Sequence, residues 1–358
     1  MRIAYTLEQC WHRVPGGTGI AAIEVARELA LRSDVEVIGV AGRHRHPPTD
    51  GFAPPIAVSS LPIGRPLLYR SWLRLGWPKV ESVVDDAVLV HSTTIIPPAT
   101  SLPLVVTIHD LAFLRHPDFF TARGNKVFRR SLEIVRDKAA MVLCSSQATI
   151  DDCVTAGIDS DRLRLVPLGV TTHAITDTDR ARVRATYDLP ERFVLFVGTL
   201  EPRKNLARLI AALDSIRGAP PLVVVGMAGW GDHTPSTAYD VRFTGFVPAH
   251  NLPALYEACP VFAFPSILEG YGLPVIEAMA HGAAVVTSRG TSTEEVAGGA
   301  AVLVDPLSVE SIASGISEAL GNVDQLRASG VARAAQVPWS VTAEVTMSAY
   351  KKVLGVSS

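Results

Sequence analysis

The sequence predicts an α/β protein built from two doubly wound parallel-sheet domains. Its 358 residues are too many for one typical core and suit two domains of about 150–200 residues each. In both halves of the chain, segments typical of strands alternate with segments typical of helices, which is the pattern of parallel sheets covered by helices. Strand segments such as 104–108 and 193–198 are continuous apolar runs and the mean hydropathy is +0.26, as expected of strands buried on both faces.

The first domain is expected to span residues 1–170. It opens with a strand at 2–7, a glycine-rich loop at 14–19 and a helix at about 19–31. The remaining elements are strands at 35–42, 88–93, 104–110, 141–146 and 163–169, with a proline-rich stretch after the first of them and a helix around 126–138.

The second domain is expected to span residues 171–339. Its linker lies at the start of the polar segment 171–190, and its first strand is 193–198. The following elements are strands at 221–227, 241–246, 261–266, 284–288 and 301–305, with helices at 205–217, 252–258 and 273–280. The last helical pattern, 340–358, is expected to pack back on the first domain.

Composition narrows the class of protein. The chain has 33 basic and 35 acidic residues, so its overall charge gives no reason to expect a nucleic-acid partner. The cysteines show no CxxC spacing and no histidine cluster, which favours free thiols in a reduced compartment over a zinc site; they are Cys10, Cys144, Cys153 and Cys259. The N-terminus leads directly into a strand without an apolar signal core, and no apolar run approaches the roughly 18 residues of a membrane span, so we expect a cytoplasmic protein.

The most informative motif is segment 265–280, where Glu269 and Glu277 flank a Gly-Tyr-Gly turn and a proline. Pro274 suits the first turn of a helix, which predicts a helix over 273–280. Free N–H groups at a helix N-terminus form an anion site, and glycines let a ligand approach the backbone; the turn comprises Gly270, Tyr271, Gly272 and Leu273. The pattern indicates a grip on a nucleotide sugar, and the alternative is a core helix with two solvated glutamates.

Two further loops follow strands of the second half. Loop 199–205 begins at Thr199 and carries Arg203 and Lys204, a cation pair that suits a diphosphate. The alternative for this pair is a solvated helix start. In loop 244–248, Phe246 and Val247 are placed to offer backbone groups to a nucleobase edge. Ligands of open parallel sheets bind at such carboxyl ends of strands.

The first half offers two weaker signals. Gly16, Gly17 and Gly19 lie ahead of a predicted helix and can cradle an anion or pack closely against a substrate. His109, followed by Asp110, ends a buried strand where a sugar or leaving group can sit between the domains. A strand-end histidine is more often structural, which remains the alternative here.

Together these segments resemble glycosyltransferase family 4, the retaining GT-B enzymes, over nearly the whole chain. The resemblance rests on the ordered segments PGGTG, TIHDLAF, VPLGV, VGTLEPRKN and PSILEGYGLPVIEAMAHGAAVVTS. It implies a GT-B fold, in which two Rossmann-like domains face each other across a cleft. The first domain would be the acceptor side and the second would bind the donor.

The resemblance also implies roles for individual residues. Glu269 would meet a hexose hydroxyl and Glu277 the ribose, while Lys204 and Arg203 would bind the diphosphate. The loop from Gly16 to Gly19 would belong to the donor site, and His109 would lie near the transferred sugar. Two departures stand out: Gly198-Thr199 replaces a common Gly-Arg, and Thr293 replaces a common proline before Glu294-Glu295.

The implied reaction moves a hexose, with mannose as the first guess, from a nucleoside-diphosphate sugar to an acceptor hydroxyl with retained configuration. The acceptor would be a glycan, a glycolipid or a small molecule. The leaving phosphate would accept the acceptor proton, and no metal or other cofactor would be needed. The Asp-x-Asp pairs Asp159/Asp161 and Asp177/Asp179 are accordingly interpreted as turn and capping residues of polar loops.

Two other classes of function compete. Segment 17–22 fits the GxGxxA fingerprint of an NAD-dependent oxidoreductase, with Glu36 at a suitable distance. That fingerprint should follow its strand directly, whereas residues 8–16, with Trp11 and Pro15, intervene here. A non-catalytic sugar-nucleotide-binding protein is the second alternative, and an epimerase of the same fold a minor one.

Segment 65–79 is basic and aromatic, with no acid between Asp50 and Glu81. We favour a helix that packs its apolar face on the first domain. The alternative is an interfacial helix that holds the protein peripherally on an anionic membrane, on its inner face.

Overall fold

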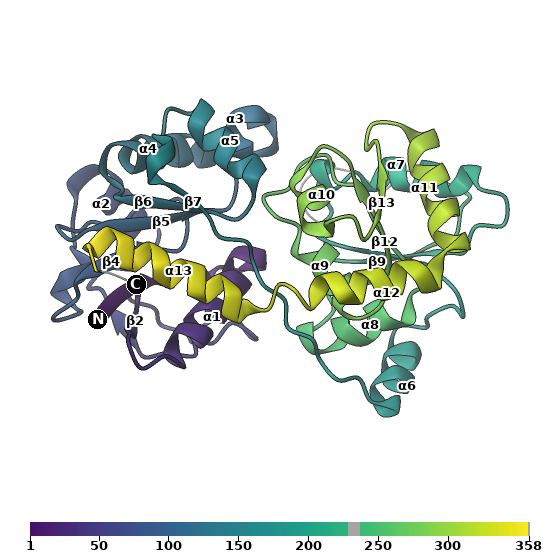
Figure 1. The fold of residues 1–358 in the computed structure, drawn as a ribbon, viewed down its shortest axis with the longest axis horizontal. Coiled ribbons are helices and arrows are strands. Elements are labelled where there is room, and N and C mark those ends of the chain that lie inside the picture. Colours follow the sequence, from purple (N-terminus) through teal and green to yellow (C-terminus); the bar gives the residue numbers. More distant parts are fainter. Residues whose placement is uncertain (228–236, 357–358) are drawn as a thin grey trace. The chain divides into compact units, whose positions relative to one another are not determined.

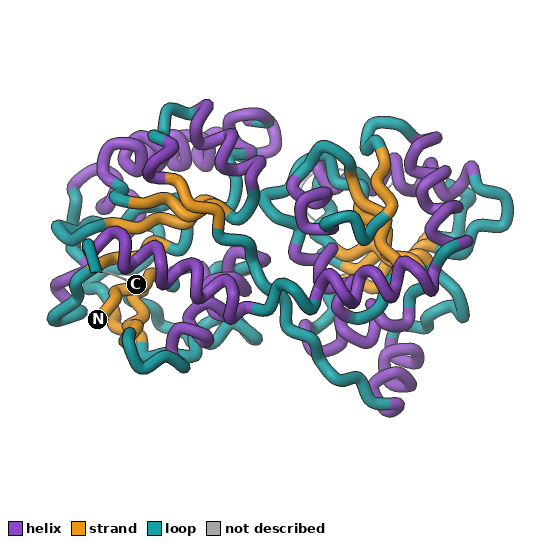
Figure 2. The backbone as a smooth tube through the Cα atoms, viewed as in Figure 1, coloured by secondary structure: helices purple, strands orange, loops and turns teal. Residues whose placement is uncertain are grey.

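The computed structural model describes residues 1–227 and 237–356, which form two compact units. The first unit comprises Met1–Gly169 and the residues from Trp339 onward, and the second comprises Val170–Pro338. Both bounds lie one residue from those expected from the sequence. Each unit has a sheet between helical layers, as Figure 2 shows, so the predicted α/β class with two parallel sheets is confirmed.

The sheet of the first unit has the strand order β3-β2-β1-β4-β5-β6-β7 among the described residues, and every pairing is parallel. Its strands are β1 (Arg2–Thr6), β2 (Glu36–Ala41), β3 (Val58–Ser60), β4 (Leu89–Ser92), β5 (Leu104–Ile108), β6 (Met141–Cys144) and β7 (Leu163–Leu165). Since β1 pairs with both β2 and β4, the strand order reverses there, and ligands of such sheets bind near this reversal.

Helices cover both faces of this sheet. They are α1 (Gly16–Ala30), α2 (Leu67–Leu75), α3 (Ala112–Arg115), α4 (Ala122–Lys138), α5 (Gln147–Thr155) and α13 (Trp339–Leu354), with short 3-10 turns at Glu8–Trp11, Val80–Ser82, Pro117–Phe119 and Ser160–Arg162. The C-terminal α13 lies beside α1 (Figure 1), and its hydrogen bonds to the rest of the first unit include the following. Tyr350 Oη lies 2.6 Å from His91 Nδ1 of β4, and the Thr342 hydroxyl donates to the Pro167 carbonyl at 2.8 Å.

The second unit has a parallel sheet of order β10-β9-β8-β11-β12-β13 among its described residues. Its strands are β8 (Val194–Val197), β9 (Leu222–Val225), β10 (Val241–Gly245), β11 (Val261–Phe264), β12 (Ala284–Ser288) and β13 (Val302–Val304). Its helices are α6 (Asp177–Thr186), α7 (Leu206–Ser215), α8 (Leu252–Ala258), α9 (Leu273–Ala280), α10 (Ser292–Ala297), α11 (Val309–Gly321) and α12 (Val323–Ala334), with 3-10 turns at Pro202–Lys204 and Ala249–Asn251. The central strands β8, β9, β11 and β12 are buried along their whole length, as their apolar sequences predict.

Three local predictions need correction. Helix α1 begins at Gly16, so the glycines expected in a loop ahead of the helix form its first turn. The proline-rich stretch contains the short edge strand β3, whose three residues are too few to give a periodic signal. Asp177 and Asp179 lie in the first turn of α6 and not in a loop, although Asp179 does form a capping box with Thr176.

All four cysteines are free, as predicted, and all four are also buried. Within the described parts of the chain, no helix is both long and apolar enough to cross a membrane.

Candidate functional site

The candidate site of the second unit is formed by the loops after β8 and β11. These strands are parallel neighbours, so their following loops emerge at the same edge of the sheet. The Ile267 N–H donates to the Arg203 carbonyl at 2.8 Å, and Asn205 Nδ2 donates to the Pro265 carbonyl at 2.9 Å. These bonds fix the cation-bearing loop against the loop that carries Glu269.

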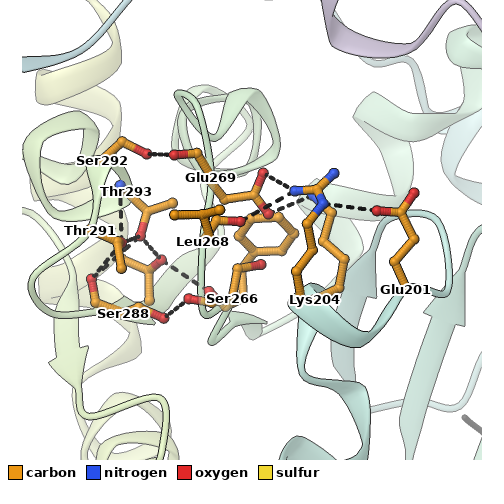
Figure 3. Close-up of polar contacts among 12 residues, drawn as sticks. Glu201, Lys204, Ser266, Leu268, Glu269, Ser288, Thr291, Ser292 and Thr293 are labelled. Atoms are coloured by element: carbon orange, nitrogen blue, oxygen red, sulfur yellow. Dashed lines mark hydrogen bonds and ion pairs between the residues drawn. The ribbon is translucent and has the colours of Figure 1, made fainter. Parts of the chain in front are cut away.

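Glu269 joins the two predicted cations. Its Oε1 lies 2.6 Å from Lys204 Nζ, and its Oε2 lies 2.9 Å from Arg203 Nη1. Figure 3 shows the Glu269 carboxylate facing these groups, with Glu201 on the far side. Glu201 Oε2 accepts from Arg203 Nε at 2.8 Å, and Lys204 Nζ lies 4.7 Å from the centre of the Phe264 ring. The structure therefore brings Arg203, Lys204 and Glu269 into one ion-pair cluster.

Burial makes this cluster electrostatically strong. The side chains of Lys204 and Glu269 are 9% and 8% exposed, and that of Arg203 is 25% exposed. Burial alone would raise the pKa of the Glu269 carboxyl, but the charges of Arg203 and Lys204 outweigh it and hold that pKa at about 2. For Lys204 burial is the largest effect and lowers the pKa of its ammonium, even though Glu269 opposes the shift.

The glycine turn has the geometry that its sequence predicts. Gly272 has a φ of +106° and immediately precedes α9, which has a proline in its first turn. A Cβ on Gly272 would lie 2.7 Å from Thr293 Cγ2, so a side chain has no room there. Tyr271 and Leu273 are each 7% exposed. The helix bounds, Leu273–Ala280, are those predicted from the sequence.

Glu277 lies in the second turn of α9 and is partly buried. Its Oε2 accepts a hydrogen bond from the Tyr256 hydroxyl at 3.1 Å. Burial raises the pKa of the Glu277 carboxyl, and the Tyr256 hydrogen bond opposes the increase. A carboxylate has about four acceptor positions, so Glu277 can accept further hydrogen bonds from a donor such as a hydroxyl.

The other donor residues predicted in this unit follow β8 and β10. Thr199 comes after Gly198, which Gly226 approaches so closely that a Cβ on Gly226 would lie 1.9 Å from the Gly198 carbonyl oxygen. Phe246 is 69% exposed directly after β10, whereas Val247 is buried. The Phe246 ring is thus open to solvent at the carboxyl edge of the sheet.

The remaining predicted residues lie in the first unit. His109 follows β5, and its Nε2 lies 3.1 Å from the Thr93 carbonyl oxygen. Burial lowers the pKa of His109, while the Thr93 carbonyl and Asp110 oppose the shift. His109 also lines a cavity of about 20 Å³ together with Tyr5, His91 and Thr107. Such a volume holds about one water molecule and no sugar.

The glycines of the first unit serve the start of α1. Gly16 has a φ of +61°, which favours glycine. A Cβ on Gly19 would lie 2.7 Å from Pro15 Cβ and 3.0 Å from the Phe52 ring, so Gly19 allows close packing. Gly17 is exposed in the first turn. The described contacts of these glycines are local to the first unit and include no residue of the cation cluster.

Sequence reasoning missed several partners of the site. Glu201 stands in the same loop as Arg203, and its spacing of two residues was a readable signal. Phe264, Tyr256 and Ser292 had no such signal, because each reaches the site from a separate element. The Ser292 hydroxyl donates to the Glu269 carbonyl at 2.8 Å.

No group of three or more potential metal ligands among His, Cys, Asp and Glu occurs in residues 1–227 and 237–356. The Asp-x-Asp residues instead make local contacts. Asp159 caps the short turn that contains Asp161, and Asp177 pairs with Arg180 at 2.6 Å.

Comparisons with known proteins agree across both units. The family model described as Glycosyltransferase Family 4 matches residues 15–174, and the one described as Glycosyl transferases group 1 matches residues 177–335. The O-antigen chain mannosyltransferase B of Escherichia coli is 31% identical over 266 residues, which cover 69% of this chain and 70% of that protein.

Two further matches extend the comparison. The serotype-specific mannosyltransferase WbdA of Escherichia coli is 28% identical over 287 residues, or 74% of this chain, and the match spans only 35% of that longer protein. The solved structure of HepE from Anabaena in complex with UDP-glucose has a TM-score of 0.73 at 20% identity, covering 99% of this chain and 100% of that one. The fold of the two proteins is therefore the same.

Proposed function

The chain belongs to glycosyltransferase family 4 and is a glycosyltransferase of the GT-B fold, and from this premise we propose that it transfers a hexose from a nucleoside-diphosphate sugar to an acceptor hydroxyl with retained configuration. The observation that carries the proposal is the buried cluster of Arg203, Lys204 and Glu269 beside the glycine turn of α9. It combines cations for a diphosphate with a carboxylate for sugar hydroxyls.

Arg203 and Lys204 would bind the diphosphate and stabilise the negative charge that grows on it as the glycosidic bond breaks. Both cations pair with Glu269 in the structure. A bound diphosphate would take over some of their N–H donors, which leaves the Glu269 carboxylate able to accept from a sugar hydroxyl. The low pKa of Glu269 keeps it ionised for this task near neutral pH.

Glu277 would accept hydrogen bonds from the ribose hydroxyls. It lies in the helix that begins directly after the glycine turn, and Tyr256 orients its carboxylate. The exposed Phe246 ring and the neighbouring backbone would contact the nucleobase. The leaving phosphate would accept the proton of the acceptor hydroxyl, so that no metal ion is needed. Thr199 would contribute to the same site. The family resemblance also assigns Gly16, Gly17 and Gly19 to the donor and His109 to the sugar, and these roles stay predictions.

The favoured sugar is mannose, because two of the related proteins are named as mannosyltransferases. A glycan or glycolipid acceptor follows from the O-antigen relative in the same way. The NAD-dependent alternative is disfavoured because a 3-10 turn, Glu8–Trp11, separates β1 from α1. A dinucleotide fingerprint needs its strand, turn and helix to be contiguous.

The test is a donor screen. Calorimetry with GDP-mannose, UDP-glucose and dTDP-glucose in the presence of EDTA should give binding by at least one donor, and NADH should not bind. Product from that donor and a mannose-containing acceptor should retain the anomeric configuration by NMR. An inverted product, or turnover that requires added magnesium or manganese, would contradict the mechanism. Donor binding without any product from an acceptor library would favour the non-catalytic alternative.

We further propose that α2 contacts an anionic membrane. The favoured expectation of a packing face is met by Leu68, Trp72 and Leu73, which are at most 6% exposed and lie in the first unit's core. Segment 65–79 nevertheless also exposes large apolar side chains and cations. They are Leu67 at 62%, Leu75 at 77% and Trp77 at 52% exposed, with exposed Arg65, Arg70, Arg74 and Lys79. Exposed apolar and basic side chains in one short segment suit an anionic interface.

Liposome sedimentation tests this contact. Wild-type protein should sediment with anionic liposomes at low salt, and less so at physiological salt, where screening acts over about 8 Å. Arg70→Glu with Arg74→Glu should release it without changing donor affinity. The matched control is Arg129→Glu with Arg130→Glu, which reverses the charge of another exposed basic pair, on α4. This control variant should still sediment with the liposomes. Equal release by both double variants would point to nonspecific charge attraction and refute a role for α2.

A further inference from the structure

We infer that Ser292 and Thr293 are positioning residues, which hold the turn from Glu269 to Gly272 in place for the donor sugar. This inference rests on the proposed function. The two side chains come from the first turn of α10, and both are buried, at 1% and 0% exposed. The sequence assigned this segment little role in the site.

Ser292 makes the direct contact. Its hydroxyl donates to the Glu269 carbonyl oxygen at 2.8 Å, as the dashed line in Figure 3 shows. The same residue, Glu269, carries the carboxylate that bridges Lys204 and Arg203. The backbone of Glu269 is thus fixed on one side by a hydroxyl while its side chain is fixed on the other by two cations.

Thr293 makes the second contact, through its methyl group. A Cβ on Gly272 would lie 2.7 Å from Thr293 Cγ2, so the Thr293 methyl packs against the glycine that ends the turn. With φ of +106°, Gly272 has a backbone conformation that glycine adopts readily and other residues rarely adopt. Ser292 and Thr293 therefore hold the two ends of the same four-residue turn.

A chain of hydroxyl groups connects the start of α10 to the sheet. Thr293 Oγ1 lies 2.8 Å from the hydroxyls of both Thr287 and Thr291, and the Ser288 hydroxyl donates to the Ser266 carbonyl at 2.6 Å. Thr287 and Ser288 end strand β12, whose neighbour β11 leads into the turn. The positions of Ser292 and Thr293 are therefore fixed by contacts with the sheet.

This arrangement predicts that Ser292 and Thr293 support recognition and transfer of the sugar more than binding of the nucleoside diphosphate. Glu269 is proposed to contact the sugar, and the nucleoside is proposed to be held elsewhere, by Glu277. A shift of Glu269 should therefore weaken recognition of the sugar and slow transfer, since displacements of about 1 Å can cost about a hundredfold in rate. Binding of the nucleoside diphosphate alone should change little. A purely structural serine would affect both ligands equally.

The experiment compares Ser292→Ala, Thr293→Val and Thr293→Ser with Ser131→Ala, a control at a buried serine of the first unit whose hydroxyl has no partner among the described residues. Circular dichroism confirms folding, and calorimetry uses GDP with GDP-mannose and UDP with UDP-glucose. Ser292→Ala and Thr293→Val should lower kcat about ten- to a hundredfold and leave nucleoside-diphosphate Kd within about twofold. Thr293→Ser keeps the hydroxyl chain but removes the methyl that packs against Gly272, so it should also lower kcat, whereas Ser131→Ala should retain most activity.

The inference is overturned if folded Ser292→Ala keeps wild-type kcat, or if both kinds of ligand lose affinity by the same factor. If the wild-type protein binds no nucleotide, the proposed function fails. Whether Ser292 fixes the position of Glu269 is then tested by denaturation measurements alone. A double-mutant cycle of Ser292→Ala with Glu269→Gln should then give non-additive shifts in the denaturation midpoint, because the two groups share one turn. Additive shifts would refute it.

Discussion

Glu269 pairs with both Arg203 and Lys204, and these ion pairs determine the consequences of removing either cation. Lys204→Ala should remove one of the two cations that a buried carboxylate contacts, which should lower the free energy of unfolding by about 1.5–3 kcal/mol. It should also depress kcat more than donor affinity. Chemical denaturation and steady-state kinetics measure the two effects.

The double variant Lys204→Met with Glu269→Gln separates stability from catalysis. Removing both charges leaves no buried carboxylate that has lost a cation, so stability should recover toward wild type while turnover stays low. Recovery of turnover in the double variant would show that neither group acts on the donor.

The pH dependence of stability follows from the same residue. The folded-state pKa of Glu269 is about 2, below its ordinary value of 4.5, so its stabilising effect is complete above pH 4.5 and is lost as pH falls toward 2. The difference in unfolding free energy between wild type and Glu269→Gln should therefore shrink over this window. Urea denaturation at pH 6, 4 and 3 measures it, and a constant difference would mean that Glu269 is not stabilised as an anion.

The pKa of the Glu277 carboxyl is shifted in the opposite direction from that of Glu269. Because burial raises the pKa of its carboxyl, the ionised group costs stability at neutral pH. Glu277→Gln keeps an acceptor for the Tyr256 hydroxyl and should leave the melting temperature unchanged or higher. Donor Kd should still rise by tenfold or more, since a hydrogen bond to a charged group contributes about 1.5–3 kcal/mol. Glu318→Gln, an exposed change in the same unit, is the matched calorimetric control.

Among the elements, the turn that leads into α9 places the strictest demand on the sequence. Gly272→Ala combines a positive φ of +106° with a Cβ contact of 2.7 Å, so it should destabilise the protein and weaken donor binding. Gly282→Ala at the other end of α9 also has a positive φ, +74°, but its Cβ meets no atom within 4 Å. It isolates the conformational strain, which is of order 1–3 kcal/mol. Thermal denaturation of both variants measures how much more stability Gly272→Ala loses because of the steric clash. Equal losses of stability in the two variants would show that there is no clash at Gly272.

At the scale of the whole molecule, α13 completes the first unit although it follows the second unit in sequence. Burial lowers the pKa of His91 to about 3, so the imidazole is neutral where it meets Tyr350. Tyr350→Phe should leave a buried ring nitrogen unpaired and lower the free energy of unfolding by about 1–3 kcal/mol. Donor affinity should be unchanged, because the cluster of Arg203, Lys204 and Glu269 belongs to the other unit. Calorimetry beside denaturation checks both statements.

The sequence by itself determined the features that depend on local pattern. Continuous apolar runs predict the buried strands β5, β8 and β11, and a proline after paired glycines predicts the bounds of α9, because strand burial and helix initiation are written in neighbouring residues. The same local logic named Arg203, Lys204 and Glu269 as candidates. It placed the start of α1 too late, since a glycine run is compatible with either a loop or a first turn.

Only the tertiary structure decided which of these groups meet. That Glu269 bridges both cations, that Tyr256 donates to Glu277 and that Ser292 holds the Glu269 carbonyl all depend on pairs separated by 65, 21 and 23 positions in the chain. Such pairs are brought together by the parallel order of β8, β11 and β12, which buries side chains that no local pattern distinguishes from solvated ones. The pKa of Glu269 has the same origin, because the partners that lower it are neighbours only after the sheet has formed.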